Sequence, residues 1–194
     1  MMRHPYATNS SERRVVPFLI AAVAIVTAVW ILPWIYQKAG WTPPVWIDAP
    51  GTLSLYGFFY LVFDRWLWRI GMFHRFGLQI PNLSGRWHGT VTTDHDGTTH
   101  DVTVDIGQDW TRILVDFRTA HSRSHSLTAA ITTSEDATFL TYEYLNEPMP
   151  GAVRTMHAHR GSARVEVQDG GNKLVGDYYS GRDRKNVGRI ALER

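Results

Sequence analysis

The sequence has no cysteine among its 194 residues. This absence excludes disulfide bonds and zinc sites with thiolate ligands, and it gives no support to an oxidised secreted protein. The length suits one domain with an appendage, and the composition of 44% hydrophobic, 12% aromatic and 20% charged residues is that of a globular protein. We therefore expect a chain that is folded by non-covalent packing alone.

The sequence also lacks a large excess of charge of either sign. The formal net charge is +2, and residues 1–80 hold seven Lys and Arg against three acidic residues, whereas residues 81–194 hold thirteen against fifteen. A protein that binds nucleic acid through its phosphates needs clustered cations. The nearly neutral C-terminal part therefore argues against DNA or RNA as a partner.

Catalytic signatures are missing too. No nucleophile elbow, phosphate-binding glycine loop or pair of acidic residues stands out, so no enzymatic activity is predicted. His157 and His159 are two residues apart on a predicted strand, so their side chains point to the same side. With His121 or His125 they could form a three-histidine zinc site. They could also serve acid–base chemistry in a membrane-tethered hydrolase. No further ligand has diagnostic spacing, and nine histidines make such a pair unsurprising. Polar or surface histidines, without metal or cofactor, are the preferred interpretation.

One long apolar run is present near the N-terminus. Residues 15–37 read VVPFLIAAVAIVTAVWILPWIYQ without a charge, and at about 1.5 Å per residue they extend over roughly 35 Å, more than a hydrocarbon core of about 30 Å. A cleaved signal peptide is the alternative, because Arg13 and Arg14 precede the run and an Ala-Val-Ala sequence ends at Ala24. The run continues well beyond Ala24, which is not typical of signal peptides. A retained transmembrane helix over about residues 15–37 is therefore predicted.

A second apolar stretch, residues 49–63, is shorter and is followed by Asp64 and Arg65. It predicts a second transmembrane helix over about residues 49–70 if Arg65 and Arg69 extend to the interface; an interfacial or re-entrant helix is the alternative. Arginines precede the first span and end or follow the second, at positions 3, 13, 14, 65, 69 and 75. By the positive-inside rule, both termini and the C-terminal domain are expected in the cytoplasm, on one side of a membrane that the chain crosses twice.

The composition of the sequence changes after Pro81, where short segments rich in Val, Ile, Tyr, Trp and Thr alternate with turns rich in Gly, Asp and Ser. The division predicted is a membrane region, 1–80, and a cytosolic β-barrel domain that binds a ligand, 81–194. Eight strands in about 110 residues predict an up-and-down, lipocalin-like barrel, with a two-sheet sandwich as the rival. The predicted strands lie near 85–93, 100–107, 110–118, 121–132, 138–146, 155–168, 173–180 and 187–193.

Gly85-Arg86-Trp87 resembles the Gly-x-Trp that opens the first strand of lipocalin-type barrels. In those proteins the Trp closes one end of the barrel, often beneath an Arg of the last strand. This resemblance implies that Arg189 covers Trp87.

The segment HSRSHS, residues 121–126, contains no apolar residue although it lies within a predicted strand. If the alternation of Leu127, Ala129 and Ile131 continues backwards, His121, Arg123 and His125 face the barrel interior. A β-bulge near His125 would instead turn the three serines inward. In both cases this strand forms a polar wall, which needs water or a polar ligand to satisfy it.

The order of motifs in the chain resembles a known family. After two membrane helices come PNLSGRWHGTV, IGQDWTRILV, an S-x-S-x-S run, LTYEYLNEP, an H-x-H-x-G segment and LVGDYYSGRDRKNVGRIAL. This arrangement resembles the two-transmembrane β-barrel effectors of bacterial CBASS anti-phage defence. The resemblance implies a cytosolic barrel that binds a cyclic dinucleotide made by a partner nucleotidyltransferase, forms homo-oligomers on binding, and disrupts the inner membrane.

The chemistry of a cyclic dinucleotide, with two flat bases and two negative charges, selects candidate ligand residues. Stacking on bases is expected from Trp110, from Tyr142 or Tyr144, and from Tyr178. Phosphate contacts are expected from Arg112, His159 and Arg182. Contacts with base edges or ribose are expected from Ser122, Ser124, Ser126 and Asn146. The main alternative function is a membrane-anchored, lipocalin-like carrier or sensor of a lipophilic small molecule, which would require a more apolar interior.

Overall fold

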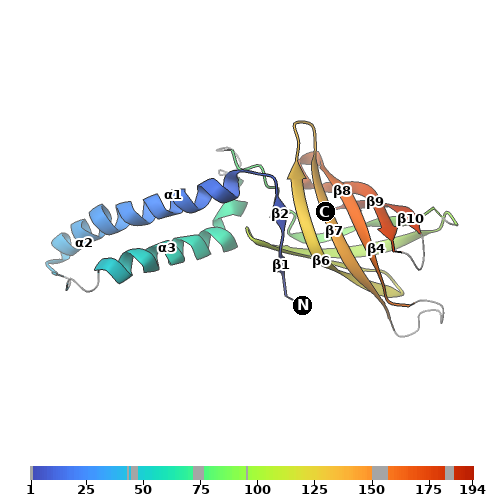
Figure 1. Cartoon of the computed structure of the whole chain (residues 1–194), viewed down its shortest axis with the longest axis horizontal. Helices are drawn as coiled ribbons and strands as arrows, with labels where there is room; N and C mark the ends of the chain where they lie inside the picture. Colours follow the sequence, from blue (N-terminus) through green and yellow to red (C-terminus); the bar gives the residue numbers. More distant parts are fainter. Residues whose placement is uncertain are drawn as a thin grey trace. The chain divides into compact units, whose positions relative to one another are not determined.

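The computed structural model describes residues 2–42, 44, 48–71, 77–94, 96–149, 157–181 and 186–194. The chain divides into two compact units, one of residues 11–78 and one that joins residues 1–10 to residues 79–194 (Figure 1). The predicted division at residue 80 placed the first ten residues with the membrane region. The structure instead pairs them with the barrel.

The helical unit begins with one continuous helix, Glu12–Ala39, which by length and composition can cross a membrane. It consists of α1 (Glu12–Val26), a π-helical turn (Thr27–Ile31) and α2 (Leu32–Ala39). The π turn ends two residues before Pro33, which lacks the N–H that a regular helix would donate to the carbonyl of Val29. Large apolar side chains, such as Phe18 at 76% and Trp30 at 73%, are exposed on this helix.

The second helix of this unit is α3 (Asp48–Arg65), which packs against α1 and is followed by a short 3₁₀ turn, Leu67–Arg69. It also exposes apolar side chains, among them Leu53 and Phe58. Its 18 residues correspond to about 27 Å. Arg75, one of the residues behind the predicted orientation, lies outside the described residues.

The other unit is a closed barrel of eight antiparallel strands in which every strand pairs with its neighbours in sequence (Figure 1). The predicted up-and-down barrel is confirmed, and the sandwich alternative was wrong. The strands are β3 (Gly85–Thr93), β4 (Thr99–Gln108), β5 (Arg112–Arg118), β6 (Ser122–Thr133), β7 (Thr138–Pro148), β8 (His159–Gln168), β9 (Lys173–Ser180) and β10 (Val187–Glu193). Residues 155 and 156 of the strand predicted at 155–168 lie outside the described residues.

One end of the barrel is closed by large side chains around Trp87, which is fully buried and donates its indole N–H to the Leu83 carbonyl at 3.0 Å. The guanidinium of Arg194 lies over the Trp87 ring, 4.7 Å from its centroid. The expectation that Arg189 would take this place was wrong. Side chains alternate along β10, so Arg189 faces outward while Ile190 and Leu192 fill the interior. The covering cation instead comes from the last residue of the chain.

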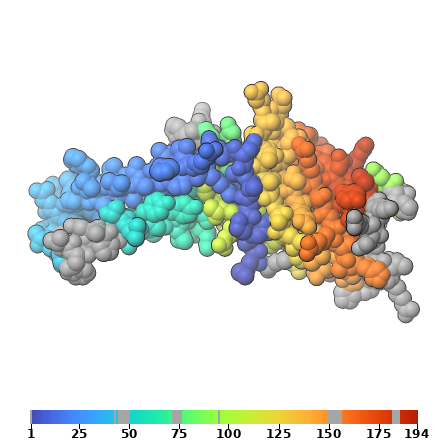
Figure 2. Space-filling model, in the orientation of Figure 1, coloured from blue at the N-terminus to red at the C-terminus, as the bar shows by residue number. Residues whose placement is uncertain are grey.

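The barrel wall is incomplete between two consecutive strands, β5 and β6. These two strands pair directly only at three positions, Asp116↔His125, Phe117↔Ser124 and Arg118↔Arg123. Beyond them the wall is completed by two short N-terminal strands: β1 (His4–Pro5) pairs with β5, and β2 (Ala7–Thr8) runs parallel to β6. Figure 2 shows this segment in dark blue on the molecular surface beside the yellow strands.

Strand β6 contains a β-bulge that decides the orientation of the HSRSHS segment. The register with β7 shifts between Ser126 and Thr128, so Leu127 is the extra residue. As a result Ser124 and Ser126 on one side of the bulge, and Ile131 on the other, all face the interior and are buried. Of the two predicted orientations, the one with a bulge and inward-facing serines is therefore confirmed.

Candidate ligand-binding site

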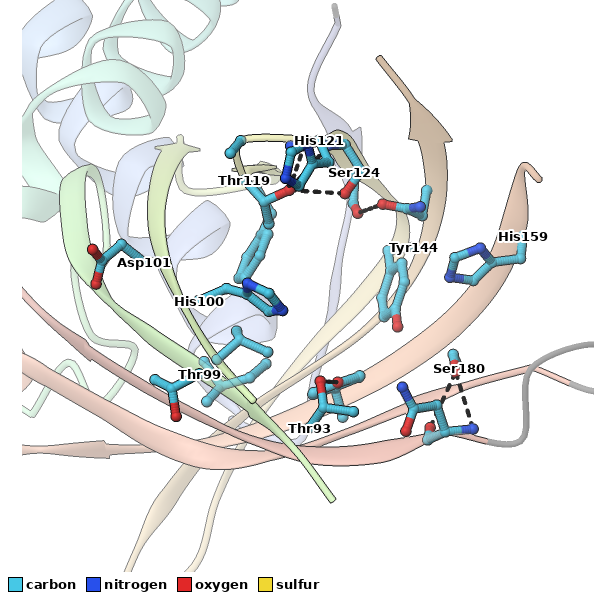
Figure 3. A pocket seen from close by; sticks show the side chains of 18 of the residues that line it. Thr93, Thr99, His100, Asp101, Thr119, His121, Ser124, Tyr144, His159 and Ser180 are labelled. Atoms are coloured by element: carbon cyan, nitrogen blue, oxygen red, sulfur yellow. Dashed lines mark hydrogen bonds between the residues drawn. The ribbon is translucent and has the colours of Figure 1, made fainter. Parts of the chain in front are cut away.

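The barrel interior opens into a cavity of about 420 Å³ at the end opposite Trp87. This volume is within the range of small-molecule sites. All eight strands or their adjoining turns contribute to its wall, in which Ser, Thr, Asn, His and Tyr predominate (Figure 3). The lining residues are Val91, Thr93, Thr99, His100, Asp101, Phe117, Thr119, Ala120, His121, Ser122, Ser124, Tyr142, Tyr144, Asn146, His159, Tyr178, Ser180, Asn186 and Ile190.

The polar side of the cavity comes from β6 and the turn before it. Ser124 donates its hydroxyl to the Oδ1 atom of Asn146, its direct partner on β7, at 2.8 Å. The Ser122 hydroxyl lies 3.1 Å from that of Thr119. Both serines are more than nine-tenths buried. Each has a local partner, so the wall is polar and largely satisfied before any ligand arrives.

Three tyrosines form the aromatic side. Tyr144 on β7 lies across Gly161, directly opposite on β8, and Tyr178 on β9 lies across Gly188 of β10; a Cβ atom at either glycine would collide with the tyrosine ring or hydroxyl. Glycine at these two positions therefore leaves room for rings that lie along the wall. Burial, with smaller contributions from neighbouring tyrosines, raises the pKa of both Tyr142 and Tyr144 well above the usual value of a phenol.

Histidines from three different parts of the sequence line the same cavity. His100 is on β4, His121 precedes β6 and His159 begins β8, and Figure 3 shows all three near the cavity with Tyr144 between β6 and β8. Asp101 points away from them, as the alternation of side chains along β4 requires. Within the described part of the lining there is no Lys or Arg. The cavity is thus built from neutral hydrogen-bonding groups, aromatic rings and imidazoles.

The structure brings seven of the eleven candidate residues together in this cavity: Ser122, Ser124, Tyr142, Tyr144, Asn146, His159 and Tyr178. They come from four strands, β6 to β9.

Three of the other candidates lie elsewhere. Trp110 is buried in the β4–β5 turn, beside the closed end, and Arg112 begins β5 at the same end with its side chain exposed. Ser126 faces the interior but its hydroxyl accepts the Val115 N–H and meets His4, below the cavity floor. These positions remove them from reach of a ligand in the cavity. Arg182 lies outside the described residues.

Half of the lining residues that were not among the candidates come from β3, β4 and β10. Thr93, His100 and Ile190 line the cavity because they share a face with Trp87, Val102 and Leu192 of the interior. The signal was available, since alternation from Trp87 along β3 leads to Val91 and Thr93. To use this signal one must also know which end of the barrel is open, and no sequence motif indicates that end.

The acidic residues and histidines that the structure describes do not gather into a metal site. Across the described ranges there is no group of three His, Cys, Asp or Glu that could hold a metal ion. The Nδ1 atom of His159 lies 3.0 Å from the carbonyl oxygen of His157. This local contact occupies one ring nitrogen of the histidine that lines the cavity.

Comparison with known proteins agrees with this arrangement. A family model described as "Cap15, cyclic dinucleotide receptor domain" matches residues 78–194, which are the barrel strands. The chain is 27% identical to CD-NTase-associated protein 15 of Yersinia aleksiciae over 184 residues, 93% of this chain and 88% of that protein. It is 26% identical to CD-NTase-associated protein 15 of Staphylococcus schleiferi over 151 residues, 77% and 80% of the two chains. The family predicted from the order of motifs is thereby confirmed: the chain belongs to the Cap15 cyclic dinucleotide receptor family of CBASS effectors.

Proposed function

We propose that the cavity at the open end of the barrel holds the cyclic dinucleotide, and that its binding makes the protein oligomerise and disrupt the inner membrane. The observation that carries this proposal is the lining itself, in which hydrogen-bonding side chains and tyrosine rings share one buried space. A fatty acid or another lipophilic molecule would displace water from this polar wall without offering hydrogen bonds in its place, which is costly.

The roles within the cavity follow from the chemistry of its groups. Tyr144 and Tyr178 offer ring faces on which a base can stack. The pair Ser124 and Asn146 offers hydroxyl and amide groups for base edges or ribose. His159 is a donor for a phosphate oxygen. A partner nucleotidyltransferase, as the name of the relatives indicates for those proteins, would supply the ligand.

The first ten residues support a two-crossing topology. They hydrogen-bond to barrel strands β5 and β6, so they and the barrel must lie on the same side of any membrane. Residues 11–78 then cross the bilayer an even number of times. Since Glu12–Ala39 has the length and composition of one crossing, α3 would be the return crossing. The arginines that flank the two helices then favour the cytoplasm for the barrel and both termini, by the positive-inside rule.

The mechanism is a population shift. A ligand changes an equilibrium only when it binds one state more tightly than the other. Ligand-bound barrels would associate and concentrate the helix pairs of many chains in a small area of bilayer. The apolar side chains exposed on these helices suit contact with lipid, so rearrangement of the clustered helices is the proposed step that disrupts the membrane.

The test uses the full chain in detergent and in vesicles, because removal of residues 1–78 would also remove the strands that complete the barrel wall. Thermal unfolding would be measured with cyclic di-AMP, cyclic di-GMP, cyclic di-UMP, the linear dinucleotides and palmitate. We expect a stabilisation by at least one cyclic dinucleotide, and release of a trapped dye from phosphatidylethanolamine–phosphatidylglycerol vesicles with the same compound. Stabilisation by palmitate alone would refute the proposal in favour of a lipophilic carrier.

A further inference from the structure

The N-terminal segment, residues 2–10, fills a gap in the barrel wall that no other part of the described chain fills. Strands β5 and β6 separate below Asp116 and His125, and each then needs a new partner for its backbone N–H and C=O groups. Strand β1 provides one for β5 through His4 and Pro5, and β2 provides one for β6 through Ala7 and Thr8. Two strand edges would be left open if this segment were absent, and open edges are templates for pairing with another chain.

Specific contacts hold the segment. Tyr6 is its buried anchor, 3% exposed, with a hydroxyl 3.4 Å from the Nε2 atom of Gln108. The Asn9 amide pairs with the backbone of Thr133 in both directions, at 2.7 and 2.9 Å. Arg3 adds an ion pair with Asp109. None of these contacts joins one of the eight barrel strands to another, so the segment can leave the seam while the eight-stranded framework stays paired.

Vacating this seam would be costly unless the same contacts were made again. Strand exchange between identical chains restores every one of them, because the N-terminal segment of a second copy carries the same His4, Tyr6 and Asn9. The net cost of exchange is then mainly that of bringing two chains together, and confinement of both chains to one bilayer lowers it. The partner that fits the seam best is therefore a second copy of this chain.

We propose that, in the ligand-bound assembly, residues 2–10 of one copy occupy the β5–β6 seam of the next copy. This inference rests on the proposed function, since it specifies how ligand binding leads to oligomers. Each chain offers one segment and one seam, so the contact is head-to-tail and extends from copy to copy or closes into a ring. Ser10 is followed directly by Ser11 and the helix that begins at Glu12, so exchange ties the membrane helix of each copy to the barrel of its neighbour.

Strand β6 links the cavity to the seam. Ser122 and Ser124 line the cavity, and the next inward-facing residue, Ser126, holds the segment through His4 Nε2 at 2.7 Å. The Ser126 hydroxyl also accepts the Val115 N–H at 3.0 Å, at the point where β5 leaves β6. A ligand that hydrogen-bonds to Ser122 and Ser124 therefore acts on β6, and the next inward-facing residue of this strand, Ser126, holds the N-terminal segment.

The experiment exploits the absence of native cysteine. Ala7 and Ala130 are register partners across β2 and β6, so cysteines at these two positions report occupancy of the seam. Chains carrying Ala7→Cys and chains carrying Ala130→Cys, with tags of different size, would be mixed in phosphatidylethanolamine–phosphatidylglycerol vesicles and oxidised with and without the cyclic dinucleotide that gives the largest thermal shift. We expect a cross-link between the two chains that increases at least tenfold with ligand. Ala191→Cys, an exposed alanine on β10, replaces Ala130→Cys in the collision control and should give none.

A second arm locks the segment in place. One chain with both Ala7→Cys and Ala130→Cys, oxidised without ligand, should bind the dinucleotide as the unmodified chain does but remain monomeric, and reduction should restore assembly. Normal assembly of the oxidised double variant, or ligand-driven assembly of the mixture without the cross-link, would overturn the exchange alone. Failure of the unmodified chain to assemble with any cyclic dinucleotide would instead refute the proposed function, and the exchange with it.

Discussion

Ser124 and Ser126 of β6 lie two residues apart and both face the barrel interior, but we expect Ser124 to bind ligand and Ser126 to stabilise the fold. Ser124 lines the cavity and bonds to Asn146, whereas Ser126 lies beneath it, 2% exposed, and bonds to the Val115 N–H and to His4. Their alanine variants should therefore separate ligand binding from stability. The change is the same in both cases, so each variant is the control for the other.

The magnitudes follow from what each hydroxyl leaves behind. Ser126→Ala leaves a buried backbone N–H without an acceptor, which costs roughly 1–3 kcal/mol, and alanine opens almost no cavity. Taking about 2 kcal/mol and roughly 3–5 °C per kcal/mol for a unit of this size, we expect Tm to fall by about 6–10 °C. Ser124→Ala removes a hydrogen bond at a cavity wall that water can reach, so its loss should be only about 0.5–1 kcal/mol.

Ligand binding should show the reverse order. Loss of one direct hydrogen bond from the Ser124 hydroxyl is expected to raise Kd about tenfold, which corresponds to about 1.4 kcal/mol, while Ser126→Ala leaves Kd within a factor of about two. Tm would be followed by tryptophan fluorescence of the full chain in detergent, and Kd by calorimetry with the cyclic dinucleotide of the largest thermal shift. A Ser126→Ala variant that melts like the unmodified chain, or that loses more affinity than Ser124→Ala, would refute this assignment.

Three further predictions concern the barrel outside this strand. The Arg123 guanidinium, with help from that of Arg118, donates to Asp116 and lowers the pKa of its carboxyl. The pKa of Asp116 is therefore lower in the folded than in the unfolded chain. The ion pair stabilises the protein above the unfolded pKa of about 4, and this stabilisation is lost as the pH falls through the folded pKa. Asp116→Asn should therefore lower Tm at pH 7 and reduce the difference in Tm between pH 7 and pH 3, and an unchanged difference would contradict this. Burial raises the pKa of Tyr142 and Tyr144, so their stabilising contribution is full below the unfolded pKa of about 10 and declines as pH rises above it. Absorbance titration of the folded chain should show that these two tyrosines ionise after the exposed ones. The double variant Tyr142→Phe, Tyr144→Phe should lose only this late phase of the titration. Trp87→Ala should cost about 3–5 kcal/mol because the ring is fully buried at the closed end, and chemical denaturation of the full chain would measure it; a loss under about 1 kcal/mol would show that Trp87 does not close the barrel.

The sequence was sufficient for the architecture of the C-terminal domain, and alternation of side chains explains why. In β5, for example, the apolar residues Ile113, Val115 and Phe117 are spaced two apart and face the interior. Such alternation shows the extent of each strand, and turns rich in Gly and Asp show the length of each connection. Eight such strands with hairpin links have few arrangements open to them, and closure removes the exposed edges.

The N-terminal segment could not be predicted in the same way. His4-Pro5 and Ala7-Thr8 are pairs of residues too short to show any alternation, and Arg3 reads equally well as a charge that precedes a membrane span. Their role depends on a gap in the wall that exists only after β5 and β6 have folded and separated. The same limit explains the candidate residues near the closed end: Trp110 has the right chemistry for stacking, but its distance from the cavity depends on which end of the barrel opens.

The bulge at Leu127 explains why one strand can be polar at one end and apolar at the other. Without it, the inward-facing set that includes Ile131 would continue to His125 and Arg123, and two basic side chains would enter the interior. With it, Arg123 points outward and reaches Asp116, while the serines turn inward. A single extra residue therefore supplies both the ion pair that closes the wall at the open end and the hydroxyl groups that line the cavity. Deletion of Leu127 should accordingly abolish both together, whereas Leu127→Ala, which keeps the backbone count, should preserve them.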